Sequence, residues 1–368
     1  MAKTIIKNVR VFDGEVIDGP KTVAIDGTKI SDDVTDNGAS VIDGTGCTLL
    51  PGLIDCHVHI KDEDQLASCA SFGVTTVCDM ACTPPEKYLI LRAAKTPTTW
   101  LSSSLPAYEE NSRHGKLLKF VGVSADHAVH NTDEAAQFII ADAPGHEQAV
   151  LDQIQIEARR RGKMTVAHTA QYDAFSRGLQ AGFGILTHTP MERALDRNIT
   201  DQMASKNIVA VPTLTMMEAM ANSWALWGLS WIWWSLGSKR NFQHSLDSVT
   251  AMREAGVPIM AGTDSHNSGI LVIVPGKSLH HELELLVRAG LPPIEALRAA
   301  TSVAAKHFNL PDRGRIARGL RADLVLVDGR PDEDITATRR IRRVWSGGSE
   351  VLPALGPTAA GRTGCVLM

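Results

Sequence analysis

The stretch Leu49-Leu50-Pro51-Gly52-Leu53-Ile54-Asp55-Cys56-His57-Val58-His59 contains an apolar run that ends in two closely spaced histidines. The run predicts a buried strand over residues 49–54. Because side chains two residues apart in a strand point to the same side, His57 and His59 should face a common interior. Two imidazoles at the end of a buried strand are typical of a metal site, and a solvent-facing pair is the alternative.

Further apolar runs follow, separated in most cases by amphipathic stretches. They predict strands over residues 73–77, 98–101, 139–141, 164–167, 184–187, 208–211 and 257–261. Helices are expected between them, for example from Gln148 to Arg160, with Gly162 as a stop, and over residues 199–206. Strands alternating with helices in this way predict an α/β fold, a (β/α)8 TIM-type barrel over residues 49–317. Active sites in such barrels lie at the carboxyl ends of the strands.

Both ends of the chain differ in sequence pattern from the middle, because they contain short strand patterns interrupted by Gly and Asp. These patterns cover residues 4–6, 9–12 and 22–25, and again 322–327 and 343–345. We therefore expect residues 1–48 and 318–368 to assemble one small β-sandwich from both termini.

Composition excludes few classes of protein but favours some. The 368 residues carry a formal net charge of −4, so no broad basic field favours nucleic acid as a partner. The sequence shows neither a signal-peptide pattern at its start nor an apolar run long enough for a membrane-spanning helix. Most of the cysteines lie between Cys47 and Cys82 without zinc-type pairing, which predicts reduced thiols and a cytoplasmic location.

Three more residues with ligand chemistry end predicted strands: His168, His188 and Asp264. With His57 and His59 they would place four imidazoles and one carboxylate at the same mouth of the barrel. Burying so many polar groups together is costly unless a cation offsets the cost. The convergence therefore predicts a catalytic metal site.

These residues resemble the amidohydrolase superfamily over nearly the whole chain, and most closely its imidazolonepropionase-like and Xaa-Pro dipeptidase-like branch. Residues 51–55, the triplet Gly262-Thr263-Asp264 and residues 299–301, 314–316 and 319–325 are similar to the signposts of that branch. The resemblance implies that His57, His59 and Asp264 bind one metal ion, zinc or another divalent cation such as manganese or iron. It implies that His168 and His188 bind a second ion or orient substrate.

The resemblance also implies an activity. A metal-bound hydroxide would attack an amide, peptide-like or cyclic amide C–N bond of a small-molecule substrate, and Asp264 would carry the proton to the leaving nitrogen. A non-hydrolytic enzyme on the same site (a decarboxylase, dehydratase or cyclase) and a pseudoenzyme that has lost turnover are the alternatives.

One feature of that branch is missing. Its members usually carry a carbamylated lysine on the fourth strand, but residues 133–145 contain no lysine, and Lys116 and Lys119 lie before the preceding helix. A deletion of roughly a dozen residues explains this, since a helix, loop and strand need more chain than is present; a strand at another position is the alternative. Without the bridging anion we expect about one metal per chain, with His168 as fourth ligand and His188 beside it as a catalytic residue that holds substrate or transfers a proton.

Several residues could contact substrate. Trp224, Trp227, Trp231 and Trp234 share one face of a predicted helix after the seventh strand, and we predict that Trp227 and Trp231 line the substrate pocket. A membrane-interface patch and ordinary packing are equally open. His114 and His266 are predicted to touch substrate, with a purely structural loop role as the alternative.

The last four residues, Cys365-Val366-Leu367-Met368, have the form of a prenylation box. Membrane contact is expected only if Cys365 is prenylated, and a chance match to so short a pattern is the alternative. A homo-oligomer is expected.

Overall fold

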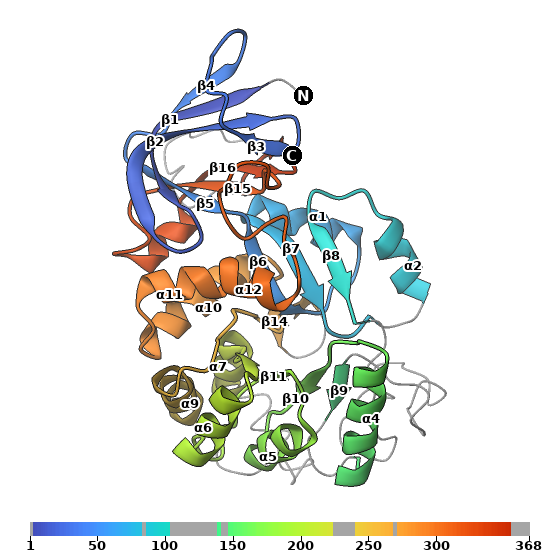
Figure 1. Ribbon diagram of the computed structural model, residues 1–368. Coiled ribbons are helices and arrows are strands. Elements are labelled where there is room, and N and C mark those ends of the chain that lie inside the picture. The colour runs from blue at the N-terminus through green and yellow to red at the C-terminus, as the bar shows by residue number, and fades with distance from the viewer. Residues whose placement is uncertain are drawn as a thin grey trace, which may run out of the picture.

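The computed structural model describes residues 3–82, 86–103, 138–140 (backbone only), 146–223, 240–267 and 271–354. Parallel strands alternating with helices form the larger part, and a sheet built from both termini lies at one end of it (Figure 1). Within the described part of the chain, every helix is too short or too polar to cross a lipid bilayer.

The parallel strands form two hydrogen-bonded groups. The first consists of β6 (Leu53–Val58), β7 (Val74–Asp79) and β8 (Thr99–Ser102), and the second of β9 (Phe138–Ile140), β10 (Val166–His168), β11 (Ile185–Thr187) and β12 (Val209–Val211). The strands predicted between residues 73 and 211 are thus all present, displaced by at most a few residues.

The eighth predicted strand, residues 257–261, joins the two groups through isolated bridges. The amide of Met260 donates to the carbonyl of Ala210 at 2.9 Å, and the amide of Cys56 donates to the carbonyl of Ala261 at 2.9 Å. Ile259 and Ser265 form parallel bridges to β12 and β6 respectively. The strands therefore follow one another from β8 through β6 to β12 and β9. No backbone pairing joins β8 to β9 among the described residues, and closure into a complete barrel stays a prediction.

Helices cover the outer side of these strands (Figure 1). Their apolar faces are buried, as in α4, where Leu151, Ile154 and Ala158 point inward. The predicted helix from Gln148 to Arg160 is α4, and Gly162 follows its end with a left-handed φ of 61°. The helices are α1 (Glu63–Ser71), α2 (Glu86–Ala93), α4 (Gln148–Arg160), α5 (Tyr172–Ala181), α6 (Arg197–Ser205), α7 (Leu214–Asn222), α9 (Phe242–Glu254), α10 (Lys277–Arg288), α11 (Pro293–Ala299) and α12 (Ser302–His307).

The terminal sheet draws strands from both ends of the chain. Its order is β17-β16-β15-β5-β1-β2-β3, with β4 paired to β1. A core that includes Ile6, Leu49, Leu324 and Trp345 packs against it. The sandwich arrangement and the domain bounds stay predictions. The strands are β1 (Thr4–Phe12), β2 (Ile17–Asp26), β3 (Lys29–Ser31), β4 (Ser40–Asp43), β5 (Cys47–Pro51), β15 (Leu324–Asp328), β16 (Ile341–Ser346) and β17 (Ser349–Val351); a short hairpin, β13 (His266–Asn267) and β14 (Val272–Ile273), and the 3-10 helix η4 (Ile335–Arg339) complete the structure.

The single strand predicted over residues 49–54 is wrong, because the run is divided between two sheets. β5 ends at Pro51 in the terminal sheet, and β6 begins at Leu53 in the parallel group. The chain crosses at Gly52, whose amide donates to the carbonyl of Asp323 at 2.7 Å. A Cβ atom at Gly52 would lie 2.1 Å from Oγ1 of Thr75. Hydrophobic periodicity could not reveal this division, since both strands are buried and apolar.

Replacing Gly52 with alanine is expected to lower the free energy of unfolding by about 1–3 kcal/mol, the usual cost of overpacking a core. Urea denaturation measures this change. The matched control is Gly184→Ala, because a Cβ there would have only the Thr165 carbonyl oxygen nearby, at 4.0 Å. Equal stabilities of the two variants would contradict the close approach at Gly52.

His280 on α10 links the helical part to the terminal region. Its Nδ1 lies 3.1 Å from Oγ1 of Thr338, and its Nε2 lies 3.0 Å from the carbonyl oxygen of Phe72. Burial lowers the pKa of His280 to about 4. An unfolded chain, with a histidine pKa of about 6.5, therefore binds more protons than the folded one between these pH values.

The contribution of His280 to stability should accordingly be complete above pH 6.5 and should be lost as the pH falls toward 4. The expected loss is about 3 kcal/mol, at about 1.4 kcal/mol for each pKa unit. Urea unfolding between pH 4.5 and 7.5, with a chelator present so that metal release does not contribute, measures it. The variant His280→Gln should show a flatter dependence, and parallel curves for the two proteins would contradict the assignment.

Candidate metal centre

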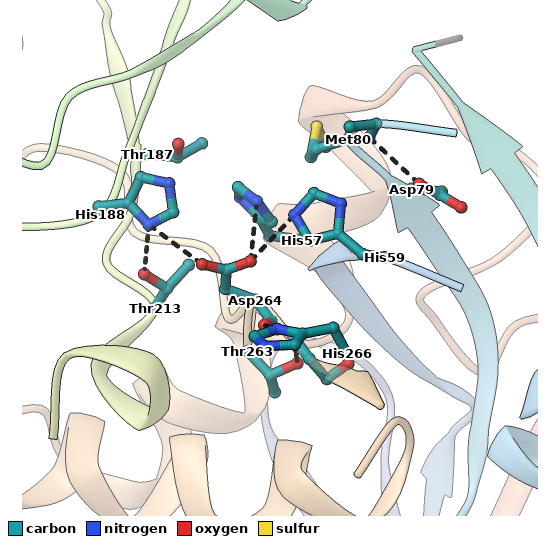
Figure 2. Close-up of polar contacts among 12 residues, drawn as sticks. His57, His59, Asp79, Met80, Thr187, His188, Thr213, Thr263, Asp264 and His266 are labelled. Atoms are coloured by element: carbon teal, nitrogen blue, oxygen red, sulfur yellow. Dashed lines mark hydrogen bonds and ion pairs between the residues drawn. The ribbon is translucent and has the colours of Figure 1, made fainter. Parts of the chain in front are cut away.

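His57, His59 and Asp264 form a compact group of potential ligands at the carboxyl end of β6 (Figure 2). Oδ1 of Asp264 lies 3.0 Å from Nε2 of His59 and 3.6 Å from Nε2 of His57. One ligand atom from each of the three residues lies within 4.8 Å of the others. Two imidazoles and a carboxylate at this spacing fit a single divalent cation.

Backbone contacts between β6 and the segment after residue 261 bring the carboxylate to the histidines. The amide of Asp264 donates to the carbonyl of His57 at 2.8 Å. Gly262 permits this approach, because a Cβ atom there would lie 3.0 Å from the backbone nitrogen of His57 and 2.5 Å from Cγ1 of Val211. Asp264 itself adopts a left-handed φ of 54°, which is uncommon for a residue with a side chain.

The buried carboxylate of Asp55 stabilises the backbone on both sides of this contact by accepting hydrogen bonds. Its Oδ2 accepts a hydrogen bond from Oγ1 of Thr263 at 2.7 Å, and its Oδ1 accepts from the amides of Thr263 at 3.0 Å and His57 at 3.3 Å. Burial raises the pKa of Asp55 to about 7. Asp55 alternates in register with His57 and His59, and this pattern in the sequence could have revealed its supporting role.

His188 stands beside the three-residue group. Its Nδ1 lies 2.8 Å from Oγ1 of Thr213 and 3.8 Å from Oδ2 of Asp264 (Figure 2). Its Nε2 is buried and has no hydrogen-bond partner among the described residues. The ring of His168 lies against it, with 4.1 Å between ring centroids. The structure thus brings His168 and His188 together next to the compact group, rather than into it.

The charges within the site favour an ionised Asp264 and neutral His57 and His188 side chains. Burial lowers the pKa of His57 to about 3 and that of His188 well below its usual range, so both rings keep a lone pair. Burial opposes ionisation of Asp264, but the surrounding histidines, His57 foremost, hold its pKa below the usual range. Burial also disfavours the charged form of His59, yet its hydrogen bond to Asp264 raises its pKa. A cation that binds here therefore competes with a proton.

Of the remaining residues predicted to contact substrate or membrane, the structure describes His266. Nδ1 of His266 lies 3.0 Å from the backbone carbonyl oxygen of Asp264, a local loop contact, and its contact with substrate stays a prediction. His114, Trp227, Trp231 and Cys365 lie outside the described residues.

The fourth parallel strand lies where the sequence predicted it. β9 pairs with β10 in parallel register, which sets Ile140 opposite His168. The residue at the level of this histidine is therefore an isoleucine and not a lysine.

The model of the Amidohydrolase family matches residues 48–351. The chain belongs to this amidohydrolase family. The family relationship, together with the series of parallel strands, indicates a TIM-barrel-like α/β fold. It also agrees with a divalent metal at the group formed by His57, His59 and Asp264.

Individual relatives are distant. The chain is 27% identical over 323 residues to an adenine deaminase of Bacillus subtilis, covering 82% of this chain and 50% of the relative. It is 26% identical over 226 residues to an ochratoxinase of Aspergillus niger, covering 59% and 44%. The chain thus spans about half the length of the curated relatives it matches. A solved Xaa-Pro dipeptidase with bound methionine has a TM-score of 0.76 at 21% identity, covering 95% of this chain and 100% of that one.

Proposed function

We propose that this amidohydrolase uses one divalent cation to hydrolyse an amide, peptide-like or cyclic amide C–N bond in a small-molecule substrate. The observation that carries the proposal is the compact group of His57, His59 and Asp264, whose ligand atoms lie within 4.8 Å of one another. Nitrogen and oxygen ligands of this kind suit zinc, and manganese or iron are alternatives.

The residue paired with His168 in the neighbouring strand supports a single cation rather than a second one at His168 and His188. Ile140 occupies the backbone position opposite His168, so β9, among the described residues, provides no anionic side chain at this level to bridge two cations. Two dications a few ångströms apart would then repel each other without compensation. We propose His168 as the fourth ligand, which leaves His188 to hold substrate or transfer a proton.

The two oxygens of Asp264 suggest a division of roles. Oδ1 faces His57 on β6 and His59 directly after it, whereas Oδ2 faces His188. A divalent cation held by these residues would supply a nucleophile at neutral pH, since such cations lower the pKa of water to about 7. The ionised carboxylate of Asp264 would accept the proton of that water and deliver it to the leaving nitrogen. The neutral His188 would accept a hydrogen bond from the substrate at Nε2.

Deamination of an aminopurine is a second candidate, supported by the similarity to an adenine deaminase. This reaction also breaks a C–N bond by attack of water on a trigonal carbon, and it releases ammonia. The same residues could serve it with one cation.

A substrate screen with added zinc or manganese tests the proposal. N-acyl amino acids, dipeptides and lactams would be followed by release of a free amine, and adenine by release of ammonia. Product formation that requires metal and is lost in Asp264→Asn is the expected result. A protein that binds no metal and turns over none of these compounds would instead be a binding protein on an amidohydrolase scaffold.

A further inference from the structure

A buried glutamate on α10 is connected to His188 through the first turn of α7. Glu282 is fully buried, and its Oε1 accepts a hydrogen bond from the amide of Leu214 at 2.9 Å. Its Oε2 accepts from the amide of Thr215 at 2.7 Å and from Oγ1 of Thr215 at 2.8 Å. The carboxyl group therefore occupies the amino-terminal end of α7, where the amides and the helix dipole favour a negative charge. Burial opposes that charge and raises the pKa of Glu282 to about 8.

This contact changes the role of Thr213, the residue at the N-cap position of α7. A threonine there ordinarily caps the helix with its own hydroxyl, but Thr213 makes no side-chain capping hydrogen bond. Glu282, from another helix, binds the amides instead. The Thr213 hydroxyl is thereby available to His188, whose Nδ1 lies 2.8 Å from it.

The backbone of Thr213 shows that this arrangement is imposed by its surroundings. Thr213 has φ 49° and ψ 46°, a left-handed conformation that is unfavourable for a β-branched residue. Its side chain is fully buried. Such a conformation persists only where neighbouring contacts hold it, and the three hydrogen bonds of Glu282 to the next two residues supply such contacts.

The surroundings of Nδ1 also select one form of the His188 ring. Two oxygens lie near this atom, Oγ1 of Thr213 at 2.8 Å and Oδ2 of Asp264 at 3.8 Å. The ionised carboxylate can only accept, so it favours a proton on Nδ1, and the Thr213 hydroxyl, which can accept as well as donate, fits a proton there. Nε2 then keeps its lone pair, and it is the atom that is buried without a hydrogen-bond partner among the described residues.

We propose that Glu282 and Thr213 are positioning residues that hold His188 with its proton on Nδ1 and its Nε2 lone pair available to a metal ion or a substrate proton. The catalytic use of that lone pair rests on the proposed function. The position and protonation of the ring are independent of that function, and both can be measured without metal or substrate.

The decisive variant is Thr213→Val, which removes the hydroxyl but keeps the size and branching of the side chain. Thr213→Ser restores the hydroxyl. Thr338→Val is the matched control, because Thr338 is also fully buried and its Oγ1 lies 3.1 Å from Nδ1 of another histidine, His280. All three variants are compared with the wild-type chain after thermal denaturation has shown that they fold.

The first readout is 15N NMR of the histidine rings in metal-free protein, with the His188 signals identified by their absence in His188→Gln. We expect protonated Nδ1 and unprotonated Nε2 in the wild type and in Thr213→Ser and Thr338→Val. Of the two oxygens near Nδ1, Thr213→Val leaves only that of the Asp264 carboxylate at 3.8 Å, beyond hydrogen-bond distance, and should show a mixture of tautomers. A proton on Nε2 in the wild type, or an unchanged ring in Thr213→Val, would overturn the proposal.

The second readout is turnover of any substrate found in the screen. Residues that orient a metal-site histidine typically contribute 10–100-fold to activity or metal affinity, so kcat should fall about tenfold in Thr213→Val and in Glu282→Gln, with KM little changed. Thr213→Ser should restore most of kcat, and Thr338→Val should retain it. The expected NMR result without any turnover would leave the positioning intact and reject only the proposed function. Normal kcat in Thr213→Val would reject the positioning role.

Discussion

Asp264→Asn is expected to lower kcat by roughly 10³-fold or more while the protein stays folded. The carboxylate is both a proposed ligand and the proposed proton carrier, and an amide can do neither well. Asparagine tolerates the left-handed backbone that Asp264 adopts, so the fold should be preserved. Initial rates with the best substrate from the screen, together with circular dichroism, measure both parts of the prediction.

Asp247→Asn provides the matched control for this loss. Asp247 is exposed on α9, and its Oδ1 accepts a hydrogen bond from Nε2 of Gln243 at 2.8 Å. Its amide variant should keep wild-type turnover. His57→Ala should behave like Asp264→Asn. More than a few per cent of wild-type turnover in either site variant would remove the residue from the catalytic group.

The purified protein is expected to contain about one divalent metal ion per chain and to show no response to bicarbonate. Without an anionic bridge, a second dication beside the first is repelled, and no lysine is available opposite His168 for carbamylation. Elemental analysis by plasma mass spectrometry gives the stoichiometry, and assays with and without bicarbonate test the modification. Two tightly bound ions per chain, or activation by bicarbonate, would contradict this interpretation of the fourth strand.

The metal content of variants also distinguishes residues that bind the ion from residues that only lie near it. His59→Ala should lose most of the bound metal, whereas His266→Ala should retain it, because the ring of His266 contacts the backbone of Asp264 rather than the ligand group. Equal metal content in the two variants would argue against the compact group as the binding site.

The strand ends were predictable from the sequence because each is a local pattern. Apolar runs that end in His57, His59, His168, His188 and Asp264 need only the alternation of strand side chains and the rule that parallel strands end at the same edge. The structure brings these five residues together at that edge, although it joins only His57, His59 and Asp264 in one compact group.

Other features depend on contacts between distant parts of the chain, which a local pattern does not contain. Glu282 looks like any acidic residue of an amphipathic helix until α10 is placed against α7. The division of the first apolar run at Gly52 likewise depends on Thr75 of β7 and on Asp323, which directly precedes β15. Thr213 gives no signal at all in the sequence, because its unusual backbone is imposed by its neighbours.

We propose that His57, His59 and Asp264 hold the catalytic cation, and anomalous diffraction from crystals grown with zinc tests this site most directly. The proposed site predicts one strong peak per chain at about 2.0–2.2 Å from ring nitrogens of His57 and His59 and from a carboxylate oxygen of Asp264. A peak that lies elsewhere, or two fully occupied peaks bridged by a modified side chain, would contradict the single-metal site.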